Sequence, residues 1–482
     1  MYANEQLLVT IPTMEINENK AFSEAITYLY SFINLETKRH DRYLASKLDT
    51  TRIRRMLAAL DSPHLTFPSI HIAGTKGKGS VAVMCTYCLR AAGLRVGLFT
   101  SPHLVDFRER IRILTPEDED GRIPEDNFIQ HLETVKSLLP DFPGATWFEL
   151  VTILAFMHFA AEKVDIAVVE VGLGGRLDTT NVLTPLVSVI TSLSLDHTKL
   201  LGDTLTHIAF EKGGIIKPGI PLVCAPQKDE ALQKLEEIVA ERNAPFILIG
   251  RDWQFHSQKQ PNSRKQTLHI KQSAVSSQQS AVGSSFFDAP AAIPLNLIGE
   301  HQVENAMVAV AALNVVKEQF GVGETAVRHG LATVQWPGRL QILHHGNTIS
   351  PMVLVDCAHN PDSALKLHQA LIHDFTYNKL WFILGVPADK DVSGVLKALF
   401  PLAEGIIVTT ANHPRSAAPE QLAQISAEHG FEATPASTMA DAVQLARQQA
   451  RSGDLICITG SIIVVGDLLN QWDSLQSVFT SV

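Results

Sequence analysis

The stretch from Ser69 to Ser80, SIHIAGTKGKGS, constrains the fold more than any other part of this chain. The β-branched side chains of Ile70 and Ile72 predict a short buried strand, and residues 81–93 suit a helix. Glycines between them would let backbone amides approach phosphate oxygens, and lysines at a helix start add positive charge. The predicted phosphate-binding residues are Gly74, Thr75, Lys76, Gly77, Lys78, Gly79 and Ser80. Their spacing departs from Walker A, and an ordinary glycine turn is the alternative.

Length and composition limit the classes of protein to consider. A chain of 482 residues exceeds one ordinary core and predicts two domains, and 45% hydrophobic with 19% charged residues indicates a globular protein. The net charge of −10 argues against nucleic-acid or anionic-membrane partners, because such binding depends on clustered Lys and Arg. Five cysteines do not form a disulfide framework, so we expect a cytoplasmic protein. The N-terminal residues lack the basic start and apolar core of a secretory signal.

Two further segments have simple structural interpretations. Cys85 and Cys88 form a CxxC inside the helix after the predicted phosphate loop, where helix packing is favoured over metal or redox chemistry. The apolar run from Leu455 to Leu469 is interrupted by polar residues and is too short to span a bilayer. It predicts a buried strand followed by a turn and a helix.

Polar residues follow or end three of the predicted strands. Strands precede Ser101 and His197, and Glu170 lies near the end of the strand DIAVVEV. The carboxyl ends of parallel strands face the ligand crevice of doubly wound sheets. Because a buried, unpaired carboxylate is costly, Glu170 indicates a bound cation. These three residues make a possible magnesium site, although Ser101 could simply end its strand and His197 could be structural, since magnesium prefers oxygen ligands.

The alternation of strands and helices divides the chain. A Ser- and Gln-rich segment at about residues 257–292 predicts a mobile surface insertion, with a regulatory or partner-binding role as the alternative. Pro337 and Gly338 suit a hinge, and the alternation restarts after them. We therefore expect an N-terminal domain of residues 1–335 and a smaller C-terminal α/β domain of residues 336–482.

Motifs along the chain occur in an order typical of one enzyme family. GTKGKGS is followed by TSPHL, FRERIRI, EVGLGGRLDTTN, SLDHTKLLG, EKGGIIKPG, HQVENAMVA, WPGRLQ, DCAHNP and ITGSIIVVG. On these motifs the chain resembles the folylpolyglutamate synthase/dihydrofolate synthase family of the Mur ligase superfamily. The resemblance implies an α/β fold with a P-loop-containing, doubly wound, Mur-ligase-type ATPase domain followed by a smaller Rossmann-like C-terminal domain.

The resemblance also implies roles for individual residues that match the family's motifs. Lys78, His197 and Lys212 would be catalytic, and Lys212 would be carbamylated at its side-chain nitrogen. Magnesium would be held by Ser101, Glu170, His197 and Lys212. ATP would contact the phosphate loop together with Asn305, Arg339, Asp356 and His359. The folate substrate would contact Thr146, Trp147, Phe148, Glu149, Leu177, Asp178 and Thr179.

Several of these residues have plainer alternatives when the sequence is taken alone. Lys212 would ordinarily be a surface lysine, and Asn305 an ordinary polar residue of a helix. Trp147 and Phe148 offer a flat apolar surface for a pterin, but they could equally pack the helix that they begin.

The reaction that the resemblance implies is an ATP-dependent ligation. Two Mg²⁺ ions would assist ATP, a carboxylate would be converted to an acyl phosphate, and L-glutamate would displace phosphate. The acceptors would be dihydropteroate, giving dihydrofolate, and reduced folates, giving folylpolyglutamates. The alternatives are polyglutamylation only, another Mur-type acid–amino acid ligase, or a nucleotide switch or motor. We expect a monomer that binds neither nucleic acid nor membranes.

Overall fold

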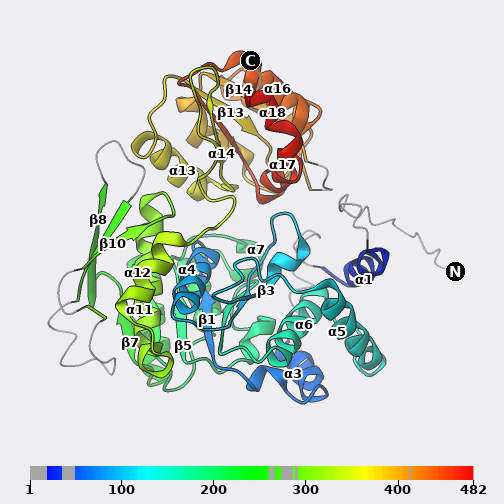
Figure 1. The fold of residues 1–482 in the computed structure, drawn as a ribbon, viewed down its shortest axis with the longest axis vertical. Helices are drawn as coiled ribbons and strands as arrows, with labels where there is room; N and C mark the ends of the chain where they lie inside the picture. The colour runs from blue at the N-terminus through cyan, green and yellow to red at the C-terminus, as the bar shows by residue number, and fades with distance from the viewer. Residues whose placement is uncertain are drawn as a thin grey trace.

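The computed structural model describes residues 19–34, 49–259, 266–272, 286–287, 291–411, 413 and 415–480. Two α/β domains lie one above the other in Figure 1. Strands β1–β10 belong to the N-terminal domain and β11–β16 to the C-terminal domain, and none of these sheets includes strands of both. The chain passes between the domains after α12 (Glu324–Thr333) and before β11 (Gln341–His344), where the predicted division at residues 335 and 336 lies.

The main sheet of the N-terminal domain has the order β3-β2-β4-β1-β5-β6-β7, in which only β3 runs antiparallel to its neighbour. Its central strands are buried on both faces, which explains their continuous apolar sequences. The strands are β1 (Ser69–Ala73), β2 (Val96–Phe99), β3 (Ile111–Leu114), β4 (Ile166–Glu170), β5 (Val187–Ile190), β6 (Leu222–Cys224) and β7 (Phe246–Leu248).

Helices cover both faces of this sheet, as the predicted doubly wound fold requires. Within β4, Ile166 and Val168 pack in one core while Ala167 and Val169 pack in another. The first core is covered by α4 (Lys78–Ala91), α11 (Glu300–Phe320) and α12. The opposite face is covered by α1 (Lys20–Tyr30), α3 (Thr50–Ala58), α5 (Glu125–Leu138), α6 (Trp147–Ala161), α8 (Leu205–Gly213) and α9 (Asp229–Glu241).

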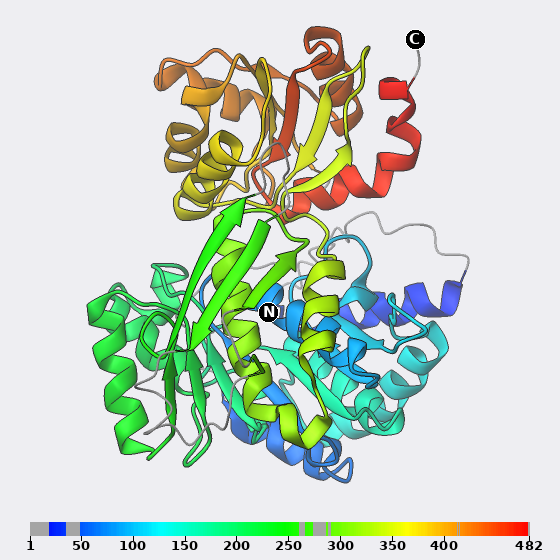
Figure 2. The same ribbon diagram turned by 60° about the vertical axis from the view of Figure 1, so that its left-hand side comes forward.

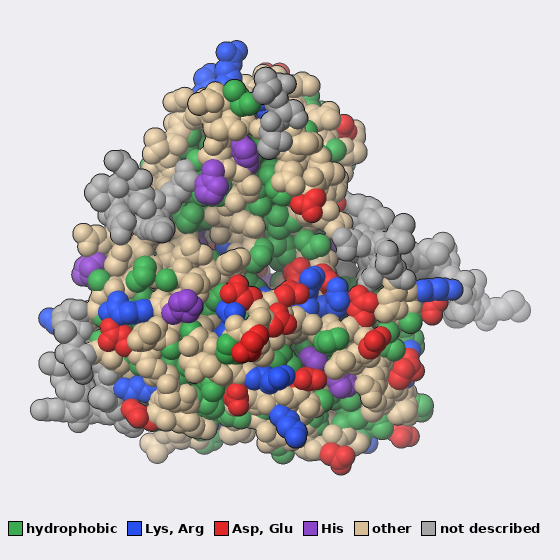
Figure 3. Space-filling view, viewed as in Figure 1, with side chains coloured by type: hydrophobic (Ala, Val, Ile, Leu, Met, Phe, Trp, Pro, Cys, Tyr) green, Lys and Arg blue, Asp and Glu red, His purple; other side chains and the backbone are tan. Residues whose placement is uncertain are grey.

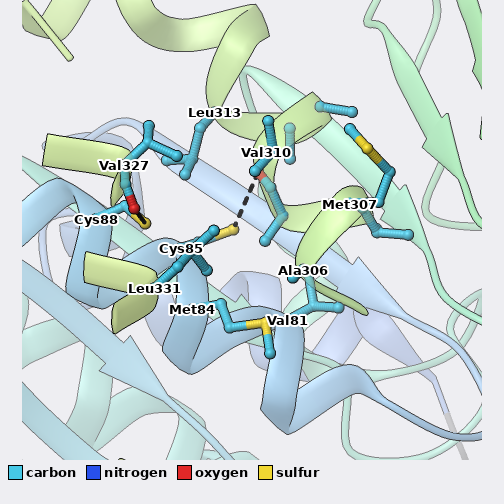
Figure 4. Packing of buried hydrophobic residues seen from close by; sticks show 14 of the residues in the cluster. Val81, Met84, Cys85, Cys88, Ala306, Met307, Val310, Leu313, Val327 and Leu331 are labelled. Carbon is cyan, nitrogen blue, oxygen red and sulfur yellow. Dashed lines mark hydrogen bonds between the residues drawn. The ribbon is translucent and has the colours of Figure 1, made fainter. Parts of the chain in front are cut away.

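The CxxC sulfurs lie inside the first core, which confirms the packing interpretation. Cys85 Sγ approaches the Ala309 carbonyl oxygen at 3.9 Å, and Cys88 Sγ approaches that of Val327 at 3.6 Å. Figure 4 shows both residues of α4 facing the apolar side chains of α11 and α12. Burial raises the pKa of both thiols, which keeps them in the unreactive protonated form.

A second sheet of the N-terminal domain corrects the predicted insertion in part. β8 (Trp253–Lys259), β9 (Gln266–Gln272) and β10 (Ala291–Leu295) form an antiparallel sheet beside α11 and α12 (Figure 2). The prediction of a mobile loop is therefore wrong for residues 266–272, because Leu268 and Ile270 alternate into the core. Most of the Ser- and Gln-rich residues beyond Gln272 lie outside the described residues.

The C-terminal domain has a sheet of order β11-β12-β16-β13-β14-β15, in which β11 alone is antiparallel to its neighbour. The strands after β11 are β12 (Met352–Val355), β13 (Leu380–Leu384), β14 (Gly405–Val408), β15 (Thr434–Pro435) and β16 (Leu455–Thr459). The helices are α13 (Pro361–His373), α14 (Val392–Leu399), α15 (Pro419–Glu428), α16 (Met439–Gln449), α17 (Ile462–Leu475) and α18 (Ser477–Thr480). β16 and α17 confirm the strand, turn and helix predicted for Leu455–Leu469.

The surface carries charged side chains of both signs. Basic and acidic side chains are interspersed on the face of the N-terminal domain drawn in Figure 3. Within the part of the chain that the structure describes, no helix is both long enough and apolar enough to cross a membrane.

Candidate active site

A cavity of about 660 Å³ lies where the two domains meet. The N-terminal domain contributes the loop of residues 74–80 and side chains at the carboxyl ends of its strands, as expected for a doubly wound sheet. The C-terminal domain contributes Arg339, Asp356 and His359. Residues predicted from motifs far apart in the chain therefore share one cavity.

The glycine loop has the close backbone packing that its sequence predicts. Gly74 and Gly77 have φ values of 152° and 88°, which other residues rarely adopt. A Cβ atom would lie 1.8 Å from Thr191 Oγ1 at Gly74 and 2.2 Å from Asn305 Oδ1 at Gly77. Gly77 is the N-cap of α4 and provides no side-chain cap, so the start of this helix suits an anion.

Lysines in the loop have different partners. Lys76 Nζ lies 3.0 Å from Asp196 Oδ2. Burial acts to raise the pKa of Asp196, but Lys76, His197 and Lys390 together outweigh it and the pKa is lowered. Lys78 instead approaches Glu170 Oε1 at 3.7 Å. Lys76 thus braces the loop against the exit of β5, whereas Lys78 lies beside the buried carboxylate of β4.

The predicted magnesium ligands all line this cavity, and two of them are in contact. Glu170 Oε2 accepts a hydrogen bond from the Ser101 backbone N–H at 3.1 Å, and burial raises the pKa of Glu170. His197 lines the same cavity at the start of α7 (Thr198–Leu201). Among the described residues, no three His, Cys, Asp or Glu side chains cluster as a ready metal site. The oxygen donors of Ser101 and Glu170 nevertheless fit magnesium, because a cation would offset the burial of the carboxylate.

Lys212 is buried in α8 and is not the surface lysine that its sequence context suggests. Its Nζ donates a hydrogen bond to the Gly74 carbonyl oxygen at 2.9 Å. Burial, with a further contribution from nearby Lys78, lowers the pKa of Lys212 to about 7. A substantial fraction of this amine is therefore neutral at physiological pH, and the neutral amine is the form that can add CO₂ to become a carbamate.

Cavity-lining residues of the C-terminal domain are hydrogen-bonded to the segment that links the two domains. Asp356 accepts hydrogen bonds from the backbone N–H groups of Leu340 at 3.0 Å and Ala358 at 2.9 Å. Burial opposes the charge of Arg339, but Cys357 and Asp356 raise its pKa. His359 Nδ1 donates to the Cys357 carbonyl oxygen at 3.0 Å, and burial lowers the pKa of His359 to about 4. His359 is therefore neutral at pH 7, with Nε2 as an acceptor.

Asn305 stands beside the phosphate loop from α11. Its Nδ2 donates a hydrogen bond to Gln302 Oε1 at 3.0 Å. Its Oδ1 lies so close to Gly77 that a Cβ atom there would overlap it. Asn305 lines the cavity, so it is placed to contact a nucleotide as well as to pack the helix.

Five of the predicted folate-binding residues line the cavity: Thr146, Phe148, Leu177, Asp178 and Thr179. Gly172 allows the Phe148 ring to approach, because a Cβ there would lie 2.3 Å from the ring. Asp178 accepts hydrogen bonds from the backbone N–H groups of Leu173 at 2.9 Å and Thr180 at 3.0 Å. Burial raises the pKa of Asp178.

The other two predicted folate-binding residues lie behind this wall. Trp147 is fully buried and stacks on Tyr30 with ring centroids 5.6 Å apart, so it packs the helix that it begins. Glu149 completes a capping box with Thr146, and its Oε2 accepts a hydrogen bond from Arg52 Nη2 at 2.8 Å. Neither side chain lines the cavity, because only part of the first turn of α6 faces the cavity.

A pair of residues that the sequence analysis missed also lines the cavity. Arg110 Nε donates a hydrogen bond to His103 Nδ1 at 2.8 Å. Burial, reinforced by Arg110, lowers the pKa of His103 well below its ordinary value. Both residues belong to quoted motifs, TSPHL and FRERIRI. The antiparallel pairing of β2 with β3 brings these motifs together, and recognising it as a hairpin could have predicted the contact.

Comparisons with known proteins cover nearly the whole chain. Residues 72–313 match the family described as Mur ligase middle domain, and residues 338–462 match Mur ligase, glutamate ligase domain. The chain is 34% identical to the dihydrofolate synthase/folylpolyglutamate synthase of Mycobacterium tuberculosis, with 90% of this chain and 93% of that protein covered. It is 31% identical to the enzyme of the same name from Bacillus subtilis, with 86% and 93% covered.

Solved structures give the same picture. Folylpolyglutamate synthase of M. tuberculosis, complexed with ADP and AMPPCP, aligns with a TM-score of 0.79 at 31% identity and covers 94% of this chain and 98% of its own. E. coli FolC in complex with ADP aligns with a TM-score of 0.77 at 28% identity, with 95% and 98% covered.

Proposed function

Because this chain belongs to the dihydrofolate synthase/folylpolyglutamate synthase family of Mur ligases, we propose that it joins L-glutamate to folates at the expense of ATP. ATP converts the acceptor carboxylate to an acyl phosphate, and the glutamate amine then displaces phosphate to form a C–N bond. The observation that carries this proposal is the single cavity in which the phosphate loop, Glu170, Lys212 and Arg339 meet. No side-chain nucleophile is needed, so positioning and charge neutralisation account for catalysis.

The phosphate groups of ATP are assigned to the loop of residues 74–80. Amides at the start of α4 and the ammonium group of Lys78 complement phosphoryl oxygens. Arg339 adds positive charge from the other domain, and Asn305 and Asp356 lie where they can orient the nucleotide. His359 offers a neutral acceptor at the same wall.

Ser101, Glu170, His197 and a carbamylated Lys212 are the residues assigned to hold two Mg²⁺ ions. When bound, Mg²⁺ supplies neutralisation of charge on the phosphoryl oxygens. The neutral Lys212 amine adds to CO₂ and loses one proton, which replaces an ammonium with an anionic oxygen donor. The lowered pKa of Lys212 supports this assignment.

The folate is assigned to the part of the cavity lined by Thr146, Phe148, Leu177, Asp178 and Thr179. Phe148 offers an apolar ring face for the pterin, and Asp178 offers a hydrogen-bond acceptor. We propose that dihydropteroate and reduced folates share this site, so that one enzyme makes both dihydrofolate and folylpolyglutamates.

A direct assay tests the proposal. Purified protein is incubated with ATP, Mg²⁺, L-glutamate and either dihydropteroate or tetrahydrofolate, and products are identified by mass. One ADP per glutamate incorporated is expected with each acceptor, and each acceptor should inhibit use of the other. Extension of tetrahydrofolate alone would leave polyglutamylation only, ligation of a different acid would indicate another Mur-type ligase, and ADP release without ligation would indicate a nucleotide switch.

We further propose that the enzyme works as a cytoplasmic monomer without nucleic-acid or membrane partners. Light scattering of the active enzyme would test the oligomeric state, with a mass near 52.8 kDa expected.

A further inference from the structure

A loop of the N-terminal domain, residues Ser101 to Asp106, runs from the candidate active site to the C-terminal domain. At its start, the Ser101 backbone N–H donates to Glu170 at 3.1 Å. Three residues later, Leu104 packs against the apolar core formed by β12, β16 and α17. Figure 3 shows apolar side chains along the junction between the domains. One short segment therefore contacts both the assigned magnesium ligands and the second domain.

The loop is held rigid by one carboxylate. Glu109 accepts hydrogen bonds from the backbone N–H groups of Leu104 at 2.7 Å, Val105 at 3.0 Å and Asp106 at 2.8 Å. Charge-assisted bonds of this kind are stronger than neutral ones. This brace stiffens residues 104–106, the half of the loop that lies nearer the C-terminal domain.

The contact on the C-terminal domain depends on a glycine inside α17. A Cβ atom at Gly466 would lie 2.1 Å from the Leu104 carbonyl oxygen. Both atoms belong to, or are fixed to, the backbone, so no side-chain rotation would relieve the overlap. Glycine inside a helix is otherwise unfavourable, so its presence here calls for a packing reason. Close approach of the two domains supplies that reason.

Gly338, in the segment that links the two domains, also packs against Leu104. A Cβ atom at Gly338 would lie 3.4 Å from Leu104 Cδ2, and the Gly338 carbonyl oxygen accepts the Cys357 backbone N–H at 3.0 Å. Leu104 thus lies between α17 and the residue that precedes Arg339. The arrangement that seats Leu104 also puts Arg339 and Glu170 on the walls of one cavity.

We propose that docking of Leu104 on Gly466 couples closure of the two domains to the placement of Ser101 beside Glu170. Leu104 and Gly466 are therefore positioning residues for phosphoryl transfer, a role that rests on the ligase function proposed above. Both residues line the cavity, but the role proposed for them is exerted through Ser101 and Arg339. Closure assembles the site, so ATP is used productively only when both domains contribute.

The test compares Gly466→Ala with Gly323→Ala, since a Cβ at Gly323 would meet no atom within 4 Å. Gly466→Ala should lower kcat about ten- to a hundredfold, as a displacement near 1 Å does, while the KM for ATP changes little. Its Tm should be maintained, because alanine favours the helix. Small-angle scattering with AMPPCP and tetrahydrofolate should show a more open molecule than the wild type. Gly323→Ala should match the wild type in kcat and scattering.

A second pair of variants keeps the test decisive if Gly466→Ala folds poorly. Leu104→Ala should lower kcat and open the molecule in the same direction, whereas Leu365→Ala, at an exposed leucine of α13, should do neither. Adding Leu104→Ala to Gly466→Ala should cause little further loss, because both remove one contact. The coupling would be overturned if Gly466→Ala had the kcat of the wild type and scattering as compact as that of the wild type. If Gly466→Ala does not fold, the same result in Leu104→Ala would overturn it. A wild type that makes no product would instead overturn the proposed function.

Discussion

The side-chain nitrogen of Lys212 donates a hydrogen bond to the Gly74 carbonyl oxygen across 2.9 Å, which ties α8 to the phosphate loop. Burial, with a further contribution from the nearby Lys78, lowers the pKa of Lys212 to about 7. The geometry puts an amine that is easily deprotonated next to the loop assigned to phosphate, where an ammonium would repel Mg²⁺.

If the proposed carbamate on Lys212 helps to hold magnesium, Lys212→Ala should lower ligase activity by about 100-fold or more, because the substitution removes that anionic ligand. Acetate or another short carboxylate should restore part of the activity by entering the space. Lys228→Ala, at an exposed lysine, is the matched control. Full activity of Lys212→Ala without added carboxylate would show that Lys212 is not needed to hold magnesium.

The stability of the wild type should also depend on this lysine in CO₂-free buffer. Between about pH 7 and the ordinary lysine pKa of 10.5, the unfolded chain holds a proton that the folded protein has lost. The free energy of unfolding should therefore rise with pH across this window. Lys212→Met should lack that rise, and urea unfolding at pH 7 and pH 9.5 measures the difference. Parallel pH dependences in both proteins would contradict the lowered pKa.

The strand, glycine turn and helix around the predicted phosphate loop follow from the sequence, because Gly74 and Gly77 allow the positive φ values that the turn needs. The sequence also predicts that Ser101, Glu170 and His197 lie at strand ends. Parallel strands bring their carboxyl ends to one edge of the sheet, so these residues are expected on the same side of the domain. The burial of Lys212 could not be predicted in this way. Its partner, the Gly74 carbonyl, is more than a hundred residues away, and only the packed sheet brings α8 against the loop.

Two other differences between prediction and structure also have causes in tertiary packing. Trp147 is predicted from its motif to contact the substrate, but the direction of its side chain depends on how α6 is rotated against α1. The contact between His103 and Arg110 depends on the turn between β2 and β3, which a helix-and-strand pattern does not specify. Tertiary packing, rather than local propensity, determines both.

Phe148 and Trp147 should respond differently to substitution. Phe148→Ala removes a cavity-lining ring and should raise the KM for folate about three- to tenfold, which corresponds to the loss of one ring contact. Trp147→Phe leaves the cavity wall in place but should lower the free energy of unfolding by about 1–3 kcal/mol, because the ring is fully buried. Steady-state kinetics and urea unfolding of both variants distinguish the roles. A KM effect confined to Trp147→Phe would show that the tryptophan contacts the substrate.

Glu149 should behave as a structural residue. Its carboxylate is almost fully buried and accepts hydrogen bonds from Arg52 and from the Thr146 backbone N–H at 2.7 Å. Glu149→Gln should lower the free energy of unfolding by about 2–4 kcal/mol, because Arg52 loses its counter-charge. The folate KM should stay near that of the wild type. If KM rises severalfold while the urea midpoint is unchanged, the carboxylate acts on the substrate after all.

Lys78 and Glu170 form a pair that should matter for both stability and catalysis. Lys78 Nζ lies 3.7 Å from Glu170 Oε1, and the carboxylate is almost fully buried. Lys78→Met should abolish ligation, since the loop loses its phosphate-binding charge. It should also lower the free energy of unfolding by about 1–3 kcal/mol at pH 8, because an unpaired carboxylate remains buried.

The pH dependence and a double variant separate these two effects. Without Lys78, burial should raise the pKa of Glu170 further above its ordinary 4.5, so the folded protein takes up a proton more readily than the unfolded chain. The destabilisation should therefore be present at pH 8 and shrink as pH falls toward 5. Lys78→Met with Glu170→Gln should recover the stability at pH 8 but not the activity, because glutamine removes the buried charge without replacing the lysine. Thermal melts at both pH values measure this. Equal destabilisation at pH 5 and pH 8, or no recovery in the double variant, would show that Glu170 does not carry the buried charge that Lys78 balances.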